Sequence, residues 1–174
     1  MPWYLGTIRP IPAGTGTAPN GNTEEAIKRG SIYPYLKSIR PFKCPGDLGL
    51  PKVRYGQNCY LNGEHFGGTV FKMSKVKRPV KTFVYLDEYD KRGGDPFGYN
   101  LGSFAILPQP SNTWVDYPGM FHGYACTTSY LDGHAEVIVW DLKETRYFWN
   151  NNITATDPRD IRKLQAVRGG PPVD

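Results

Sequence analysis

Residues 125–140, ACTTSYLDGHAEVIVW, carry the clearest structural signal in the chain. Two β-prone runs, Cys126–Leu131 and His134–Trp140, flank the pair Asp132-Gly133. Two-residue type I′ hairpin turns prefer this pair, because both of their central residues need a positive φ. The segment therefore predicts an antiparallel hairpin with Asp132 and Gly133 at its turn.

The segments before the hairpin add further strand signals. Val53–Leu61 is β-prone but contains Gly56, at which we expect a β-bulge. Thr82–Leu86 is a compact run of β-branched and aromatic residues, and Phe104–Leu107 is long enough for one short strand. Together with the hairpin, these segments predict an antiparallel sheet.

Helical signals are short. Asn22 or Thr23 can cap a first helix that Gly30 ends, and the stretch Tyr35–Ile39 predicts a helical turn before Pro41.

A turn and a last helix complete the pattern. Pro45-Gly46 predicts a sharp turn. Near the end of the sequence, Asp157 can cap a helix whose first residue is Pro158. The apolar residues on one face of this helix are Ile161, Leu164 and Val167.

Composition restricts the fold class. The 174 residues fit one domain, and 20 Gly with 16 Pro exclude a coiled coil, a helical bundle and a helical solenoid. A hydrophobic content of 39% argues against disorder, and no apolar run approaches the ~18 residues of a membrane span. We expect an α+β fold, in which an antiparallel sheet with a C-terminal hairpin is joined by short helices. The expected boundaries are an irregular arm over 1–22, a single domain over 23–168 and a flexible tail over 169–174.

Several residues are candidates for catalysis or metal binding. His122, Asp132 and His134 could form a transition-metal site, but no close ligand pair accompanies them. The alternative is that Asp132 is a turn residue and His122 bonds to the backbone. Cys126 or Ser129 could pair with His122 as a nucleophile, but neither lies in a nucleophile elbow. We therefore expect no enzymatic activity.

Three cysteines leave the redox state open. Cys44, Cys59 and Cys126 are too far apart in sequence for a zinc ribbon. One disulfide of unknown pairing fits an oxidising compartment, and three buried thiols fit a reducing one.

Basic and aromatic residues suggest binding roles. The formal net charge is +5, and one basic run comprises Lys72, Lys75, Lys77, Arg78 and Lys81. This run has no nucleic-acid-binding signature nearby, so we interpret it as a solvated stretch and expect no nucleic-acid partner. The many Tyr and Trp residues leave a secreted carbohydrate-binding module as the alternative function, with an extracellular polysaccharide as its ligand.

An ordered set of segments over residues 33–168 resembles a known family. Nine residues separate His122 from Asp132-Gly133, which is the spacing that defines the prepilin-type processing-associated, pseudopilin-like family. The other matching segments are Tyr35-Leu36, Phe42 to Asp47, Arg54 to Asn58, Arg78 to Glu88 and Asp160 to Gln165.

The resemblance implies a type IV pilin-like globular head, lacking here the leader and the long apolar N-terminal helix of family members. It implies a non-enzymatic structural subunit that joins other pilin-like subunits in filament or type II secretion-system assembly. Its expected location is the periplasm, the cell surface or the extracellular space. His122, Asp132 and Gly133 match the family signature, and we interpret them as structural.

Some pseudopilin heads bind calcium, so the resemblance makes a calcium site a candidate here. No other cofactor is expected. The candidate ligands are Asp87, Glu88, Asp90 and Asp95. Calcium takes six to eight oxygen ligands. The spacing here is not that of an EF-hand, so a solvated acidic loop is the alternative.

Overall fold

The fold is mixed α+β. The computed structural model describes residues 24–28, 30, 32–47, 55–61, 72–89, 103–147 and 152–169. The helices are α1 (Glu24–Lys28), α2 (Tyr33–Leu36), α3 (Lys143–Tyr147) and α4 (Arg159–Val167), with 3-10 turns at Arg40–Phe42, Met73–Lys75 and Pro79–Lys81. The strands are β1 (Tyr55–Asn58), β2 (Phe83–Asp87), β3 (Ser103–Phe104), β4 (Thr113–Trp114), β5 (Ala125–Tyr130), β6 (Ala135–Val139) and β7 (Ile153–Thr154).

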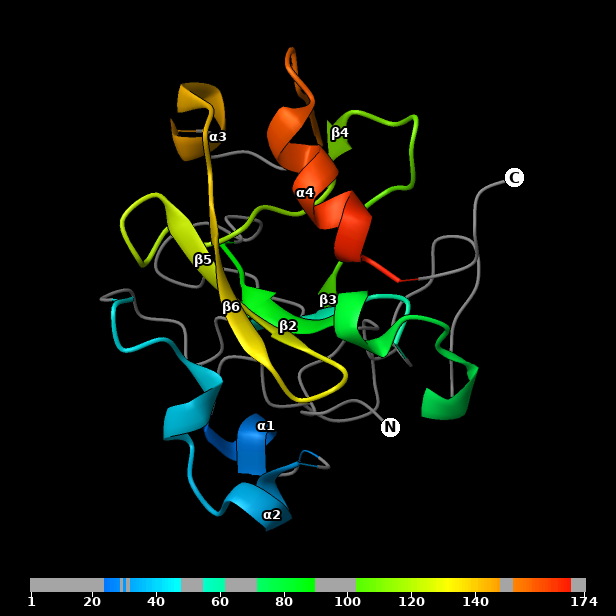
Figure 1. Ribbon diagram of the computed structural model, residues 1–174. Helices are drawn as coiled ribbons and strands as arrows, with labels where there is room; N and C mark the ends of the chain where they lie inside the picture. The colour runs from blue at the N-terminus through cyan, green and yellow to red at the C-terminus, as the bar shows by residue number, and fades with distance from the viewer. Residues whose placement is uncertain are drawn as a thin grey trace, which may run out of the picture.

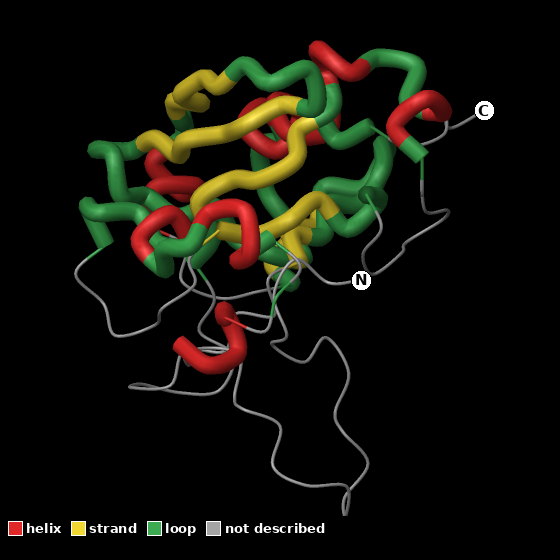
Figure 2. The backbone as a smooth tube through the Cα atoms, turned by 90° about the horizontal axis from the view of Figure 1, so that it is seen from below, coloured by secondary structure: helices red, strands yellow, loops and turns green. Residues whose placement is uncertain are grey.

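One main sheet organises the chain. Its strand order is β3-β1-β2-β5-β6, with β4 and β7 forming a separate pair. Strands β1, β2, β5 and β6 form an antiparallel series, and β3 pairs in parallel with the other edge of β1. Figure 1 shows α4 on one side of this sheet and α1 with α2 on the other, and Figure 2 shows the strands side by side. The expected antiparallel sheet is therefore present.

The hairpin β5–β6 forms as predicted, but its turn differs. The Gly133 N–H donates to the Tyr130 carbonyl at 3.0 Å, and the Tyr130 N–H donates to the His134 carbonyl at 2.9 Å. Gly133 has φ of +97°, whereas Asp132 is not among the non-glycine residues with positive φ. The loop is therefore three residues long, a type I turn followed by a bulge at glycine. The predicted two-residue type I′ turn is wrong.

The main core lies between the sheet and α4. Phe83 and Leu86 of β2 pack there against Ile161 and Leu164 of α4. These two β2 residues are three apart and share a face because the β2–β5 register shifts between Phe83 and Tyr85. Such an irregularity was expected at Gly56, but Gly56 pairs regularly with Leu86, so that prediction is wrong.

The shift at β2 turns Tyr85 and Asp87 toward the opposite face. There Tyr55 and Tyr85 contact a second, smaller cluster around Ile27 and Phe42. The N-terminal segment therefore packs on the sheet face opposite α4.

The predicted helices are present near their expected positions. α1 ends before Gly30, the helical turn before Pro41 is α2, and Pro45-Gly46 forms the expected turn. α4 begins at Arg159, one residue after the expected Pro158, and the Asp157 Oδ1 accepts the Arg159 N–H at 3.0 Å.

Some boundaries lie outside the described residues. These are the cap at Asn22 or Thr23, the arm over 1–22 and the tail after Gly169. Among the described helices, none is long and apolar enough to cross a bilayer.

Candidate functional site

Three residues from distant parts of the sequence meet beside β2. Cys44 lies in the turn after Phe42, Asp87 ends β2, and His122 lies in the loop before β5. The Cys44 Sγ is 3.2 Å from the His122 Nε2, and this nitrogen is 3.5 Å from the Asp87 Oδ2. One ligand atom from each of the three residues lies within 4.8 Å of the other two.

The Cys44 turn is shaped to approach the His122 loop closely. The Asp47 N–H donates to the Cys44 carbonyl at 3.0 Å, and the Gly46 N–H points to the Cys44 Sγ at 3.3 Å. A Cβ atom at Gly46 would lie only 2.9 Å from the Phe121 carbonyl oxygen, which does not yield easily because it is backbone. Glycine at this position therefore lets the two loops meet.

Asp87 is fully buried and is held by β5. Its Oδ2 accepts the Thr127 N–H at 2.6 Å and the Thr127 hydroxyl at 2.7 Å. Within the described residues, its other oxygen, Oδ1, has no hydrogen-bond partner. Burial raises the pKa of the Asp87 carboxyl above its usual value, although the Thr127 bonds and His122 oppose that rise.

The geometry does not suit nucleophilic catalysis. In a catalytic triad the carboxylate orients the imidazole through one nitrogen while the nucleophile contacts the other. Here the Cys44 Sγ and the Asp87 Oδ2 both approach the His122 Nε2. Burial also raises the pKa of the Cys44 thiol, and the nearby Asp87 charge adds to the rise, which disfavours a free thiolate. The three donor atoms instead lie near enough to one another to be candidate ligands of one metal ion.

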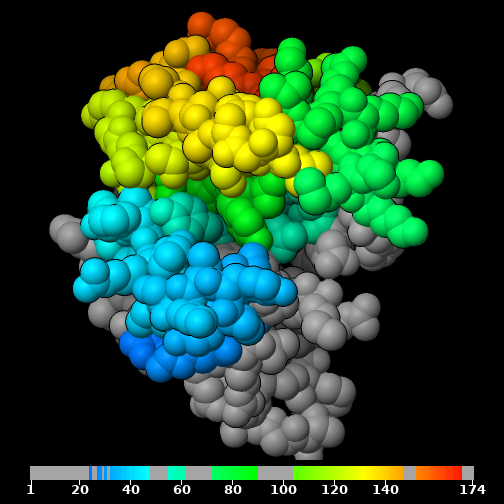
Figure 3. All heavy atoms as spheres, turned by 60° about the horizontal axis from the view of Figure 1, so that its bottom comes forward, coloured from blue at the N-terminus to red at the C-terminus, as the bar shows by residue number. Residues whose placement is uncertain are grey.

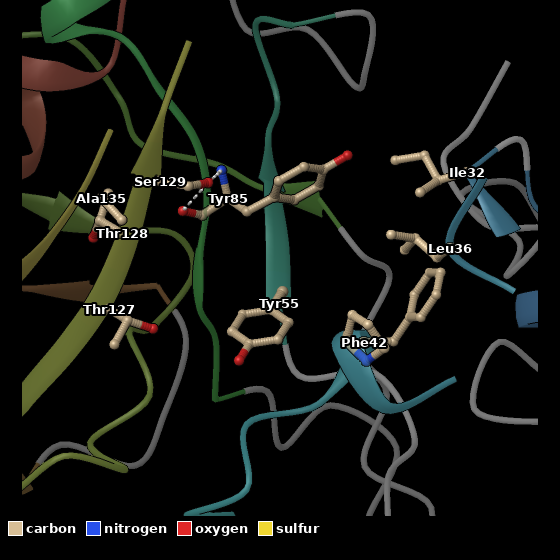
Figure 4. Close-up of a pocket in the computed structure, with 10 residues that line it drawn as sticks. Ile32, Leu36, Phe42, Tyr55, Tyr85, Thr127, Thr128, Ser129 and Ala135 are labelled. Carbon is tan, nitrogen blue, oxygen red and sulfur yellow. Dashed lines mark hydrogen bonds between the residues drawn. The ribbon is translucent and has the colours of Figure 1, made fainter. Parts of the chain in front are cut away.

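An apolar pocket of about 390 Å³ adjoins this cluster. Figure 4 shows Tyr55 and Tyr85 on the sheet side, and Ile32, Leu36 and Phe42 facing them from the N-terminal segment. Burial raises the pKa of both tyrosines to about 12, with the Asp87 and Cys44 charges contributing at Tyr55. The remaining lining residues are Pro41, Thr127, Thr128, Ser129 and Ala135. Thr127 therefore belongs both to the pocket wall and to the support of Asp87.

The candidate grouping of His122, Asp132 and His134 is not formed. His122 precedes β5 and the other two follow it, so six extended residues, about 20 Å of strand, separate them. At the turn, the His134 Nδ1 lies 2.6 Å from the Asp132 Oδ1, and the His134 ring stacks on Tyr130 with centroids 4.2 Å apart. The His134 N–H also bonds to the Asp132 Oδ1, as expected of a turn residue.

The candidate nucleophile pairs, which we did not expect, are also not formed. Cys126 is buried in the main core, and burial raises the pKa of its thiol to about 12. The Ser129 hydroxyl bonds to the backbone of Tyr85, not to His122. Cys44, Cys59 and Cys126 are all buried, and no disulfide joins any two of them in the described structure. Of these three thiols, Cys44 is the one that approaches His122.

The calcium candidates do not form a solvated acidic loop where they are described. Asp87 and Glu88 are both fully buried. Asp87 contacts Thr127 and His122, whereas Glu88 lies beside Gly56, whose added Cβ would be 2.5 Å from the Glu88 Oε2. Asp90 and Asp95 lie outside the described residues.

The other candidate binding features are divided between surface and core. The predicted solvated basic run is exposed at all five positions, Lys72, Lys75, Lys77, Arg78 and Lys81. Trp114 and Trp140 are fully buried, with ring centroids 5.9 Å apart, and therefore offer no face to a sugar. Tyr35 and Tyr124 remain exposed.

The part of the site that sequence reasoning missed is Cys44, together with the role of Asp87 beside it. Cys44, Asp87 and His122 lie in three segments far apart in the sequence, so they form no short ligand motif of the kind that predicts a metal site. Comparisons of the chain with family models, with curated proteins and with solved structures found no match.

Proposed function

We propose that the chain is a non-enzymatic structural subunit, the globular head of a pseudopilin-like or type IV pilin-like protein that takes part in filament or secretion-system assembly. Its partners are other pilin-like subunits, and its place is the periplasm, the cell surface or the extracellular space. The ordered segments that resemble the prepilin-type family support this proposal, and so does one feature of the sheet.

That feature is the sheet face opposite α4, which the N-terminal segment covers only in part. Thr127 pairs with Val137 and Ala125 with Val139, so the two valines share the face that carries Thr127 and the apolar pocket. Val137 and Val139 are 56% and 55% exposed. Figure 3 shows the N-terminal segment beside the hairpin, with the hairpin open to solvent. An apolar strip next to a pocket is a surface on which an apolar helix can pack.

The test compares the 174 residues alone with the same residues carrying an apolar helix of about 20 residues at the N-terminus. We expect the first protein to be monomeric in light scattering, and the second to form membrane-bound or filamentous assemblies in negative-stain microscopy. Burial of the helix supplies the hydrophobic free energy of assembly.

A substitution pair tests the role of the strip. Val137→Asp with Val139→Asp should prevent assembly of the helix-bearing protein, because the charges oppose helix packing. Val80→Asp is the control, because Val80 is equally exposed at 54% but lies in the 3-10 turn Pro79–Lys81. Regular fibres from the 174 residues alone would show that contacts between heads drive assembly. Normal filaments from the double variant would show that the strip formed by Val137 and Val139 is not needed for assembly.

A further inference from the structure

We propose that Cys44, Asp87 and His122 bind one zinc ion, which fastens the N-terminal segment to the sheet. This site is independent of the proposed assembly function. The three ligands come from three segments: the turn after Phe42, the end of β2 and the loop before β5. A single ion would therefore join three separate segments of the chain.

Two of the three separations between ligand atoms fit a tetrahedral centre, and the third is within 4.8 Å. Zinc lies about 2.3 Å from a thiolate and about 2.0–2.2 Å from imidazole nitrogen or carboxylate oxygen, which places neighbouring ligand atoms about 3.4–3.6 Å apart. The observed separations are 3.2 Å from the Cys44 Sγ to the His122 Nε2, and 3.5 Å from that nitrogen to the Asp87 Oδ2. An ion can therefore enter if these two separations change by only tenths of an ångström.

The donor set selects the metal. Calcium and magnesium take oxygen ligands, whereas a thiolate with an imidazole and a carboxylate suits zinc and the metals that resemble it. The side chain of His122 is 36% exposed, so solvent reaches this ligand and a water molecule can supply the fourth one. Binding releases the Cys44 thiol proton to solvent, because the ligand is the thiolate.

The burial of Asp87 is an independent observation in favour of a cation. Its Oδ1 is buried with no hydrogen-bond partner among the described residues, and a buried carboxylate is costly unless it is paired. The ion would compensate this charge. Thr127 is a positioning residue, since its N–H and hydroxyl both hold the Asp87 Oδ2.

The experiment titrates the chelator-treated, reduced full chain with Co²⁺, which reports on zinc sites through its spectrum. We expect one equivalent to bind with a thiolate-to-cobalt charge-transfer band, and Zn²⁺ to displace it, while Ca²⁺ has no effect. Cys44→Ser should abolish the band, and Asp87→Asn or His122→Ala should weaken Co²⁺ binding by at least about 100-fold. Thr127→Val should weaken binding by about 10–100-fold.

His134→Ala is the matched control, because His134 also lies beside a carboxylate, that of Asp132, but away from the cluster. This variant should bind Co²⁺ like the wild type. Absence of the thiolate band in the wild type would overturn the proposal, as would its persistence in Cys44→Ser or its loss in His134→Ala. If Cys44→Ser does not fold, X-ray absorption of the zinc-loaded wild type decides: one sulfur ligand supports the site, and none refutes it.

Discussion

Replacing Asn58 with alanine should destabilise the fold strongly, because one fully buried side chain joins three segments. The Asn58 Nδ2 donates to the Phe83 carbonyl at 2.9 Å and to the Arg168 carbonyl at 2.6 Å. The Asn58 Oδ1 accepts the Tyr60 N–H at 3.0 Å. Asn58→Ala therefore removes three hydrogen bonds and leaves two carbonyls and one N–H without these partners in the interior.

Each buried group left without a partner costs about 1–3 kcal/mol, and partial relaxation keeps the sum near the lower end. We expect Asn58→Ala to lower the free energy of unfolding by about 3–5 kcal/mol. For a domain of this size the melting temperature should fall by about 6–20 °C. Urea unfolding followed by circular dichroism measures this, and the slope of the free energy against urea should stay unchanged.

Two variants complete the test. Asn58→Asp keeps an acceptor for the Tyr60 N–H but can no longer donate to both carbonyls, so it should be at least as unstable as Asn58→Ala. Asn112→Ala removes one bond, from the Arg162 Nη2, at a half-buried site and should cost only about 1 kcal/mol. A loss below about 1 kcal/mol in Asn58→Ala would refute the reasoning, because the three bonds would then be replaced at little cost.

Three further predictions concern single positions. Gly133→Val should lower the free energy of unfolding in urea by at least about 1–2 kcal/mol, because φ is +97° at this residue. The added side chain itself meets no neighbour, so the cost comes from the backbone, and an unchanged midpoint would contradict the turn assignment. Gly56→Ala should cost about 1–3 kcal/mol, because the new Cβ would lie 2.8 Å from the Phe104 Cβ; a neutral result would mean that β1 and β3 separate easily. Burial alone would raise the pKa of Asp160, but hydrogen bonds from the Asp141 and Leu142 N–H groups and from Lys163 hold it below 3.8. The ionised carboxylate therefore stabilises the fold above that pH, and stability is lost as the pH falls through the lowered pKa. Between about pH 5 and pH 2, the free energy of unfolding should fall less steeply with decreasing pH in Asp160→Asn than in the wild type. Equal slopes of this free energy against pH would refute the assignment.

The local elements could be predicted from sequence where one short signal determines them. The Asp132-Gly133 pair located the hairpin, and the apolar spacing of Ile161 and Leu164 located the buried face of α4. The turn length was not predictable from the pair alone. A two-residue type I′ turn and a three-residue turn with a glycine bulge both need positive φ at Gly133.

The face on which a residue lies was harder to predict. Strict alternation along β2 would separate Phe83 from Leu86, and only the register shift against β5 places both in the main core. The same shift turns Asp87 toward His122, so a residue that reads as the start of an acidic loop becomes a buried carboxylate. The cluster with Cys44 depends on this tertiary arrangement, which no spacing in the sequence encodes.

The outer edge of β6 also bears on how copies of the chain avoid joining at random. An edge strand offers unpaired backbone groups to which a strand of another molecule can add. Here the Lys163 Nζ donates to the Val139 carbonyl at 2.6 Å, and Arg146 donates from its Nε and Nη2 to the Trp140 carbonyl at 2.9 and 2.8 Å. Val139 is in a non-hydrogen-bonded pair with Ala125, so its carbonyl faces away from β5, and a basic side chain from α4 occupies this acceptor. The Arg146 bonds hold α3 beside the end of the strand. Growth of the sheet from one molecule into the next would first have to break this charge-assisted bond.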